Sequence, residues 1–188
     1  ADDKNREAID QRVSPTARMA AAIRSRKELR TRSDEPYSGV DRRRKKKPTA
    51  QALQESYKKG YRDFSDHILS QLDLRKQVLV GARFAKATLR KTNLSGADLS
   101  NTHWGQANLG QAALKNARLA GAYFGNAYLV DADLRGASLV RANFEQATLK
   151  GANLCGADLT GATISEQQLA EARTNWSTIQ VNGRRSIL

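Results

Sequence analysis

Several residue types on which disulfide-bonded, catalytic or membrane proteins depend are scarce in this chain. Among 188 residues there is one cysteine, Cys155, so no disulfide can form within the chain, and this fits a reducing compartment. No apolar run approaches the roughly 18 to 20 residues that cross a bilayer. No basic segment followed by an apolar one opens the sequence as a signal peptide would. We therefore expect a cytoplasmic protein, free or peripheral to a membrane or a large complex.

Acidic residues are few relative to basic ones, and the imbalance is concentrated near the N-terminus. The net charge is +13, and residues 1–61 hold 17 Lys and Arg against 9 acids, a difference of +8. This asymmetry predicts an arm that meets an anionic partner: an acidic protein, nucleic acid or membrane headgroups. The alternative is an extension that is merely solvated. The candidate anchor is a run of six consecutive cations: Arg42, Arg43, Arg44, Lys45, Lys46 and Lys47.

The N-terminal third also contains two helix patterns. Ser14 and Pro15 form an N-cap and a first-turn proline ahead of an Ala- and Arg-rich segment, so residues 1–48 are predicted to be a partly helical basic extension with a flexible linker. Within residues 49–61, Leu53, Tyr57 and Tyr61 recur every four residues behind Thr49. This spacing predicts a capping helix that lies on the open end of a core.

Residues 62–166 repeat with a period of five. Large apolar centres run from Phe84 to Ile164, and Ala stands two residues before 15 of these 17 centres, Thr92 and Thr102 being the exceptions. Neither a helix nor a simple strand has this period. It fits a solenoid in which the centre and the preceding small residue point inward, and in which stacked coils bury what one repeat cannot.

The aromatic centres set the length of one coil. They are spaced by twenty residues, so four pentapeptides form four sides and the rings stack on one internal side. There is room for about five coils, or roughly 24 Å at about 4.8 Å per coil. We expect this core ladder to consist of Phe64, Phe84, Trp104, Phe124 and Phe144.

Motifs such as Ala97-Asp98-Leu99-Ser100-Asn101 and Ala157-Asp158-Leu159-Thr160-Gly161 resemble the pentapeptide-repeat family. The resemblance covers somewhat over half the chain and implies an all-β solenoid, a right-handed quadrilateral β-helix. Some family members imitate duplex DNA and bind type II topoisomerases. That mimicry requires a strongly negative rod, whereas this solenoid is slightly positive.

The C-terminal segment 167–188 offers two interpretations. Ser165 is placed to cap a short helix through Glu166-Gln167-Gln168-Leu169-Ala170-Glu171-Ala172-Arg173. Beyond it, apolar residues either close the last coil or form a homodimer contact. They are Trp176, Ile179, Val181, Ile187 and Leu188.

Catalysis is not expected. On the four-sided coil, His103 and Cys155 lie on opposite sides and between two and three coils apart, so they cannot form a Cys-His pair. His67 occupies an inward slot of the irregular first coil and is interpreted as a packed or cap-bonded residue. No cluster has metal-ligand spacing, and no glycine-rich phosphate loop is present, so neither a metal nor another cofactor is predicted.

The outer surface is the remaining place for function. Tyr123, Tyr128 and Val130 are predicted to lie outward beside glycines, as two exposed tyrosines of a protein-docking patch. Arg75, Lys115 and Arg135 follow the third side and could extend the basic surface. We therefore predict a non-enzymatic protein–protein interaction scaffold anchored by its basic arm. The alternative is a sequence-independent nucleic-acid binder that uses this arm.

Overall fold

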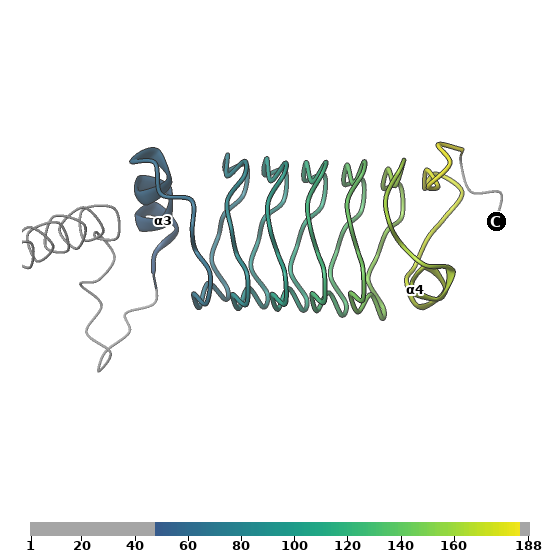
Figure 1. Cartoon of the computed structure of the whole chain (residues 1–188), viewed down its shortest axis with the longest axis horizontal. Helices are drawn as coiled ribbons and strands as arrows, with labels where there is room; N and C mark the ends of the chain where they lie inside the picture. The colour runs from purple at the N-terminus through teal and green to yellow at the C-terminus, as the bar shows by residue number, and fades with distance from the viewer. Residues whose placement is uncertain (1–47, 185–188) are drawn as a thin grey trace, which may run out of the picture. The chain divides into compact units, whose positions relative to one another are not determined.

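The computed structural model describes residues 48–184. In Figure 1 this part of the chain is a stack of coils with helix α3 (Ala50–Lys58) at one end and helix α4 (Glu166–Glu171) near the other. The N-terminal helix expected after Pro15 and the basic run Arg42–Lys47 lie outside the described residues, as do Ile187 and Leu188. No helix in residues 48–184 is long and apolar enough to cross a membrane.

Parallel bridges join residues twenty positions apart, from Asp63 with Arg83 to Asn143 with Thr163. Each coil has one bridged residue on each of four sides, so the solenoid is four-sided. A side is only two or three residues long between corners. Because each side is so short, its residues form isolated parallel bridges. The described residues therefore contain no extended strands, although the fold is a β-solenoid.

Four sides are defined by their inward centres. The aromatic side has Phe64, Phe84, Trp104, Phe124 and Phe144. The second side has Leu69, Leu89, Leu109, Leu129 and Leu149, the third side has Leu74, Leu94, Leu114, Leu134 and Leu154, and the fourth side has Leu79, Leu99, Leu119, Leu139 and Leu159. All these centres are buried.

Each corner is a tight turn. The N–H of Ala87 donates to the carbonyl of Phe84 at 3.1 Å, and the residue between them that turns the corner, Lys86, has φ +59°. A positive φ at the third position is the mark of a type II turn, which suits glycine. Gly151 (φ +71°) and Gly161 (φ +67°) occupy such corners.

The aromatic rings form a continuous stack inside the solenoid. Successive centroids are 5.5 Å apart for Phe64–Phe84, 4.4 Å for Phe84–Trp104, 6.2 Å for Trp104–Phe124 and 5.0 Å for Phe124–Phe144, with interplanar angles of 20° or less. Trp104 is fully buried. The rings stack nearly parallel because residues twenty positions apart are bridged, and this places the same side of each coil directly over that of the coil before.

Thr102 explains one of the two interruptions of the alanine pattern. The indole Nε1–H of Trp104 donates to Thr102 Oγ1 at 2.7 Å, and that hydroxyl in turn donates to the carbonyl of Leu99. A buried indole N–H needs an acceptor, which alanine cannot supply. At the other exception, the hydroxyl of Thr92 donates to the carbonyl of Leu69 at 2.7 Å. Both exceptions therefore satisfy polar groups inside the core.

The N-terminal end of the core is covered by α3. Thr49 caps this helix, its Oγ1 accepting from the N–H of Ala52 at 3.1 Å. Leu53 is buried, and the hydroxyl of Tyr57 donates to the carbonyl of Val80 at 3.0 Å. Tyr61 follows the helix and is half-buried. The helix thus covers apolar surface that the first coil would otherwise leave exposed.

Toward the C-terminal end, α4 begins at a capping box formed by Ser165 and Gln168. After the helix the chain rejoins the stack, with Arg173 bridged to Asn153 and Ile179 bridged to Asp158. Thr178 is buried, and its hydroxyl donates to the carbonyl of Leu154 at 3.0 Å. Of the two interpretations of this segment, residues 172–181 therefore follow the first and close the last coil. Trp176 stays exposed.

We predict that Trp104→Ala lowers the free energy of unfolding by about 3–5 kcal/mol, because it deletes the largest buried ring of the stack.

Thr102→Ala alone should lower the free energy of unfolding by about 1–3 kcal/mol, since it leaves the indole N–H of Trp104 without an acceptor. The same Thr102→Ala change in a Trp104→Phe background should cost close to nothing, because the neighbouring coils already combine Ala82 with Phe84 and Ala122 with Phe124. Urea unfolding of the unmodified protein, Thr102→Ala, Trp104→Phe and the double variant measures this double-mutant cycle, and the same assay applies to Trp104→Ala. An equal cost of Thr102→Ala in both backgrounds would contradict the assigned hydrogen bond.

Candidate docking surface

The predicted docking residues lie on two neighbouring sides of the solenoid. Tyr123 is an outward residue of the aromatic side, bridged to His103 in the preceding coil and to Asn143 in the next. Tyr128 is the equivalent residue of the second side, bridged to Asn108 and Thr148. Val130 follows on that side and is half-buried. The fold therefore brings all three residues to one corner region of a single coil.

The ring of Tyr123 lies flat against the solenoid. It packs on the ring of His103, with centroids 4.7 Å apart and planes tilted by 33°. A Cβ on Gly125 would lie 2.1 Å from the Tyr123 hydroxyl oxygen, and one on Gly105 would lie 3.4 Å from Tyr123 Cε1. These glycines make room for the ring. The expectation of two exposed tyrosines is thus wrong for Tyr123, which is half-buried because it covers the glycines beneath it.

Tyr128 is the more exposed of the pair, with 46% of its surface accessible. A Cβ on Gly110 would lie 3.3 Å from Tyr128 Cε1, so this ring also rests over a glycine of the preceding coil. No residue of 102–112 or 122–130 carries a formal charge, with His103 counted as neutral. We call this uncharged region the tyrosine surface; it comprises His103, Gly105, Gly110, Tyr123, Gly125, Tyr128 and Val130.

A group of cations next to the tyrosine surface was missed by the sequence analysis. It belongs to the preceding coil, and all its members are exposed. The sequence does indicate this group, because its four cations fall within nine residues, but the six consecutive cations at Arg42–Lys47 are the more conspicuous basic segment. We call this group the basic cluster; its members are Arg83, Lys86, Arg90 and Lys91.

The basic stripe expected on the third side does not form, because its arginines are paired with aspartates of their own pentapeptides. Arg75 Nη2 lies 2.6 Å from Asp73 Oδ2, and Arg135 Nη2 lies 2.7 Å from Asp133 Oδ2. Hydrogen bonding from Arg135 lowers the pKa of Asp133, and Arg75 does the same for Asp73. Of the three predicted residues, Lys115 alone makes no ion pair within residues 48–184. The two arginines are therefore neutralised by their own aspartates, whereas Lys76 and Lys115 keep charges on this side that are unpaired in the described part of the chain.

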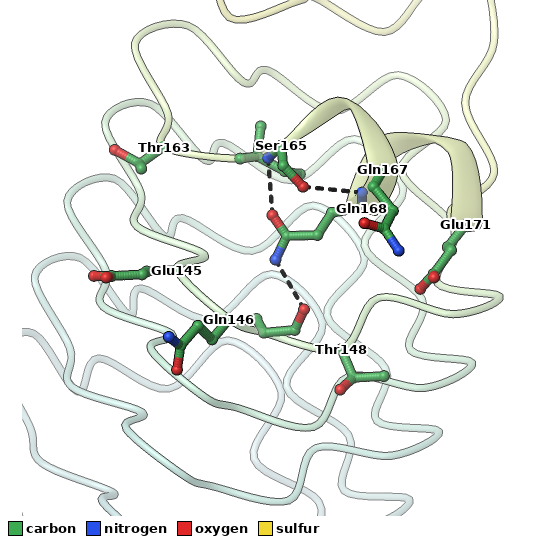
Figure 2. Close-up of a pocket in the computed structure, with 10 residues that line it drawn as sticks. Glu145, Gln146, Thr148, Thr163, Ser165, Gln167, Gln168 and Glu171 are labelled. Carbon is green, nitrogen blue, oxygen red and sulfur yellow. Dashed lines mark hydrogen bonds between the residues drawn. The ribbon is translucent and has the colours of Figure 1, made fainter.

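A groove of about 710 Å³ lies where α4 leaves the coil. The Gln168 side chain lines this groove and donates to the carbonyls of Phe144 at 2.7 Å and Ala147 at 2.8 Å. Its Oε1 accepts from the N–H of Ser165 at 2.8 Å (Figure 2). Glu145 and Glu171 stand on opposite sides of the groove in Figure 2. The groove is explained by the geometry of the helix and its cap, and no buried polar atom points into it without a partner.

The described residues contain no group of three or more His, Cys, Asp or Glu side chains that could hold a metal ion. His67 Nδ1 lies 2.7 Å from the carbonyl oxygen of Ser65, and its ring packs edge-on against Phe64. Cys155 is half-buried on the third side, and its Sγ lies 3.9 Å from the carbonyl oxygen of Arg173. His67, His103 and Cys155 therefore lie apart and do not converge on a common point.

The family model for pentapeptide repeats matches eight copies over residues 68–103, 107–145 and 137–173, more than half of the chain. The chain belongs to the pentapeptide-repeat family. Members of this family form right-handed quadrilateral β-helices and are generally non-enzymatic. The four-sided register of this pentapeptide-repeat protein agrees with that architecture.

Among solved structures, the protein is similar to HetL of the cyanobacterium Nostoc sp. strain PCC 7120, a pentapeptide-repeat protein involved in heterocyst differentiation regulation. The identity is 36% and the TM-score 0.62, over 62% of this chain and 49% of HetL, so the match spans about half the length of HetL. Two other pentapeptide-repeat proteins also match. They are alr5209 of Nostoc PCC 7120 (29% identity, TM-score 0.41, 68% of this chain and 96% of that one) and Rfr23 of Cyanothece 51142 (34%, 0.22, 54% and 62%). No curated protein sequence matches.

The Asp133–Arg135 pair gives a pH prediction. Because the folded state lowers the pKa of Asp133, its contribution to stability is present above the unfolded pKa of about 3.9 and is lost as the pH falls through the folded value. Asp133→Asn should therefore lower the free energy of unfolding near pH 7 by less than about 1 kcal/mol, since the pair is solvent-accessible. The difference from the unmodified protein should shrink below pH 4. Urea unfolding at pH 7 and pH 3 measures this. If the two proteins differ in free energy of unfolding by the same amount at pH 7 and pH 3, the effect of Asp133→Asn comes from packing and not from the ion pair.

Proposed function

We propose that this pentapeptide-repeat protein is a non-enzymatic protein–protein interaction scaffold. The solenoid presents the tyrosine surface to a protein partner, and the basic arm Arg42–Lys47 anchors the complex through an anionic surface. The observation that carries the proposal is the flat, uncharged patch formed by Tyr123, Tyr128 and His103 on a backbone bridged between every coil. Aromatic side chains held rigidly lose little entropy on binding and dominate interface energetics.

The proposal includes a reducing compartment such as the cytoplasm, which fits a chain with a single cysteine. A C-terminal homodimer is not part of it, because residues 172–181 pair with the last coil of their own chain.

A sequence-independent nucleic-acid binder is the second candidate, and the run Arg42–Lys47 favours it. A topoisomerase-binding imitation of DNA is disfavoured, since residues 62–166 carry 12 basic and 9 acidic side chains, a net +3. Affinity capture from cell lysate with and without nuclease separates the two main candidates. A scaffold retains its partners after nuclease treatment, whereas a nucleic-acid binder loses them.

We predict that a chain beginning at Thr49 keeps its fold, because α3 is retained, but loses the salt-sensitive part of partner binding that the arm contributes. Charge-driven binding weakens with salt, since the Debye length falls from about 10 Å at 0.1 M to about 3 Å at 1 M. Apolar contacts with Tyr123 and Tyr128 should resist salt, so the affinity of the shortened chain should depend on salt less steeply than that of the full chain. The measurement is the affinity for captured partners at both salt concentrations. Unchanged affinity and salt dependence would show that the arm is a passive extension.

We also predict that Cys155→Ser leaves partner binding and the cellular role unchanged, because Cys155 is half-buried on the third side, away from the tyrosine surface. His67 is likewise expected to be replaceable without loss of the cellular role. His103 was expected to be replaceable in the same way, but its ring packs on Tyr123 in the tyrosine surface, so its replacement should weaken docking. Partner capture and complementation of the cellular role measure this. Loss of the role in Cys155→Ser with folding and binding intact would contradict the scaffold proposal.

A further inference from the structure

The basic cluster differs from the other cations of the solenoid in its density: it places four cations without an ion pair on one coil, whereas the other unpaired cations of residues 63–161, namely Lys76, Lys115, Arg141 and Lys150, stand one to a coil. The ion pairs of residues 48–184 involve Arg75, Arg118 and Arg135, all on the third or fourth side. All four side chains of the basic cluster are exposed and unpaired within this range. They follow one coil around the corner between the aromatic and second sides. Four cations without an ion pair on one coil form a local anion-binding strip.

The strip is bounded on its N-terminal side by acids. Asp63 is bridged to Arg83, and the positive charge of Arg83 helps to lower the pKa of Asp63, after the larger effect of a hydrogen bond from Ser65. Asp66 occupies the corner that precedes Lys86 by one coil. Both carboxylates are exposed, so they repel an anion that extends beyond the strip in this direction. The favourable field is about one coil wide, or about 4.8 Å.

On its other side the strip continues into the tyrosine surface. Arg83, His103 and Tyr123 are bridged in succession, so they form one column along the aromatic side. Arg90 and Val130 occupy equivalent positions on the second side, with Gly110 between them. A ligand that leaves the strip toward the C-terminus therefore meets about two coils, or about 10 Å, of uncharged surface covered with rings. At the far end of the aromatic side stands an acid, Glu145.

This arrangement favours a protein segment over nucleic acid. A nucleic-acid strand carries a phosphate on every nucleotide and needs a basic track along its whole length. Here such a strand would pass from the strip onto Asp63 and Asp66 or onto uncharged surface. An acidic segment with an apolar flank matches both parts, because arginine binds carboxylates through two parallel hydrogen bonds and flat aromatic rings accept apolar side chains.

We propose that the basic cluster and the tyrosine surface together bind an extended acidic segment of a partner protein, its carboxylates on Arg83, Lys86, Arg90 and Lys91 and its apolar flank on Tyr123 and Tyr128. This inference rests on the docking function proposed above and names the chemistry of the partner.

The test uses the full chain and two fluorescent peptides of twelve residues: one with six Glu followed by Leu, Tyr and Pro residues, and one with six Glu followed by Ser and Gly. A single-stranded DNA of twelve nucleotides is the third probe. The cluster variant replaces Arg83, Lys86, Arg90 and Lys91 with Gln. It should fold, because the next coil already has Gln106 and Gln111 at the corners equivalent to Lys86 and Lys91. The control variant removes four charges from other sides: Lys76, Lys115, Arg118 and Arg173, each to Gln.

At 0.1 M salt we expect the cluster variant to bind the first peptide about tenfold more weakly, since each exposed ion pair contributes modestly. The control variant, which loses the same net charge, should change by less than about threefold. Equal losses in the two variants would overturn the inference, because binding would then follow net charge alone. Tighter binding of the DNA, lost in the cluster variant, would also overturn it and identify a nucleic-acid surface.

Gly125→Ala tests the aromatic part without removing a ring. The added Cβ displaces Tyr123 from its position over Gly125, because it would lie 2.1 Å from the hydroxyl oxygen. We expect weaker binding of the peptide with the apolar flank and unchanged binding of the peptide with Ser and Gly. Equal effects on both would remove the tyrosine surface from the inference. The scaffold proposal is tested independently by the capture experiment, and it fails if nuclease releases every captured partner.

Discussion

The structure depends on one constraint: every coil has to satisfy its backbone hydrogen bonds with the coils before and after it. Phe84 donates its N–H to the carbonyl of His103 in the next coil, and Arg83 donates to Arg62 in the coil before. This alternation repeats on each side, so adjacent coils stay in a register of twenty residues. A shift of one residue would turn centres outward and place polar side chains in the core. The register then fixes the ring stack, the four sides and the columns of outward residues.

The same constraint explains why so much of the fold could be predicted from the sequence. The fivefold period identifies the inward positions, and the aromatic residues at every twentieth position give the coil length, since only one side of the coil has aromatic inward centres. Thr102 appears as an irregularity in the sequence, and its reason appears only once Trp104 is seen to need an acceptor. The α4 helix interrupts the period, but Ser165 and Gln168 mark its start because together they form a capping box.

The outer surface was harder to predict, because side chains there are not fixed by the period. Tyr123 was expected to stand clear of the surface, yet Gly105 and Gly125 leave space into which its ring folds. On the third side, the aspartate that neutralises Arg135 lies two residues before it in the sequence. The outward direction of both side chains was predictable, but their mutual hydrogen bonds depend on rotamers that the sequence pattern does not determine.

Charge pairing distinguishes the sides of an otherwise uniform solenoid. Every side presents outward residues at the same spacing, so backbone geometry alone gives none of them a preference for a partner. Salt bridges within the third side, and between Asp98 of one coil and Arg118 of the next on the fourth side, leave those surfaces partly compensated. The coil at Arg83–Lys91 gathers four cations that form no ion pair within the described residues, and they adjoin the patch where two tyrosine rings lie over glycines. In the docking function proposed above, recognition depends on where unpaired cations gather, because a charge that no neighbouring acid neutralises still attracts an anionic partner.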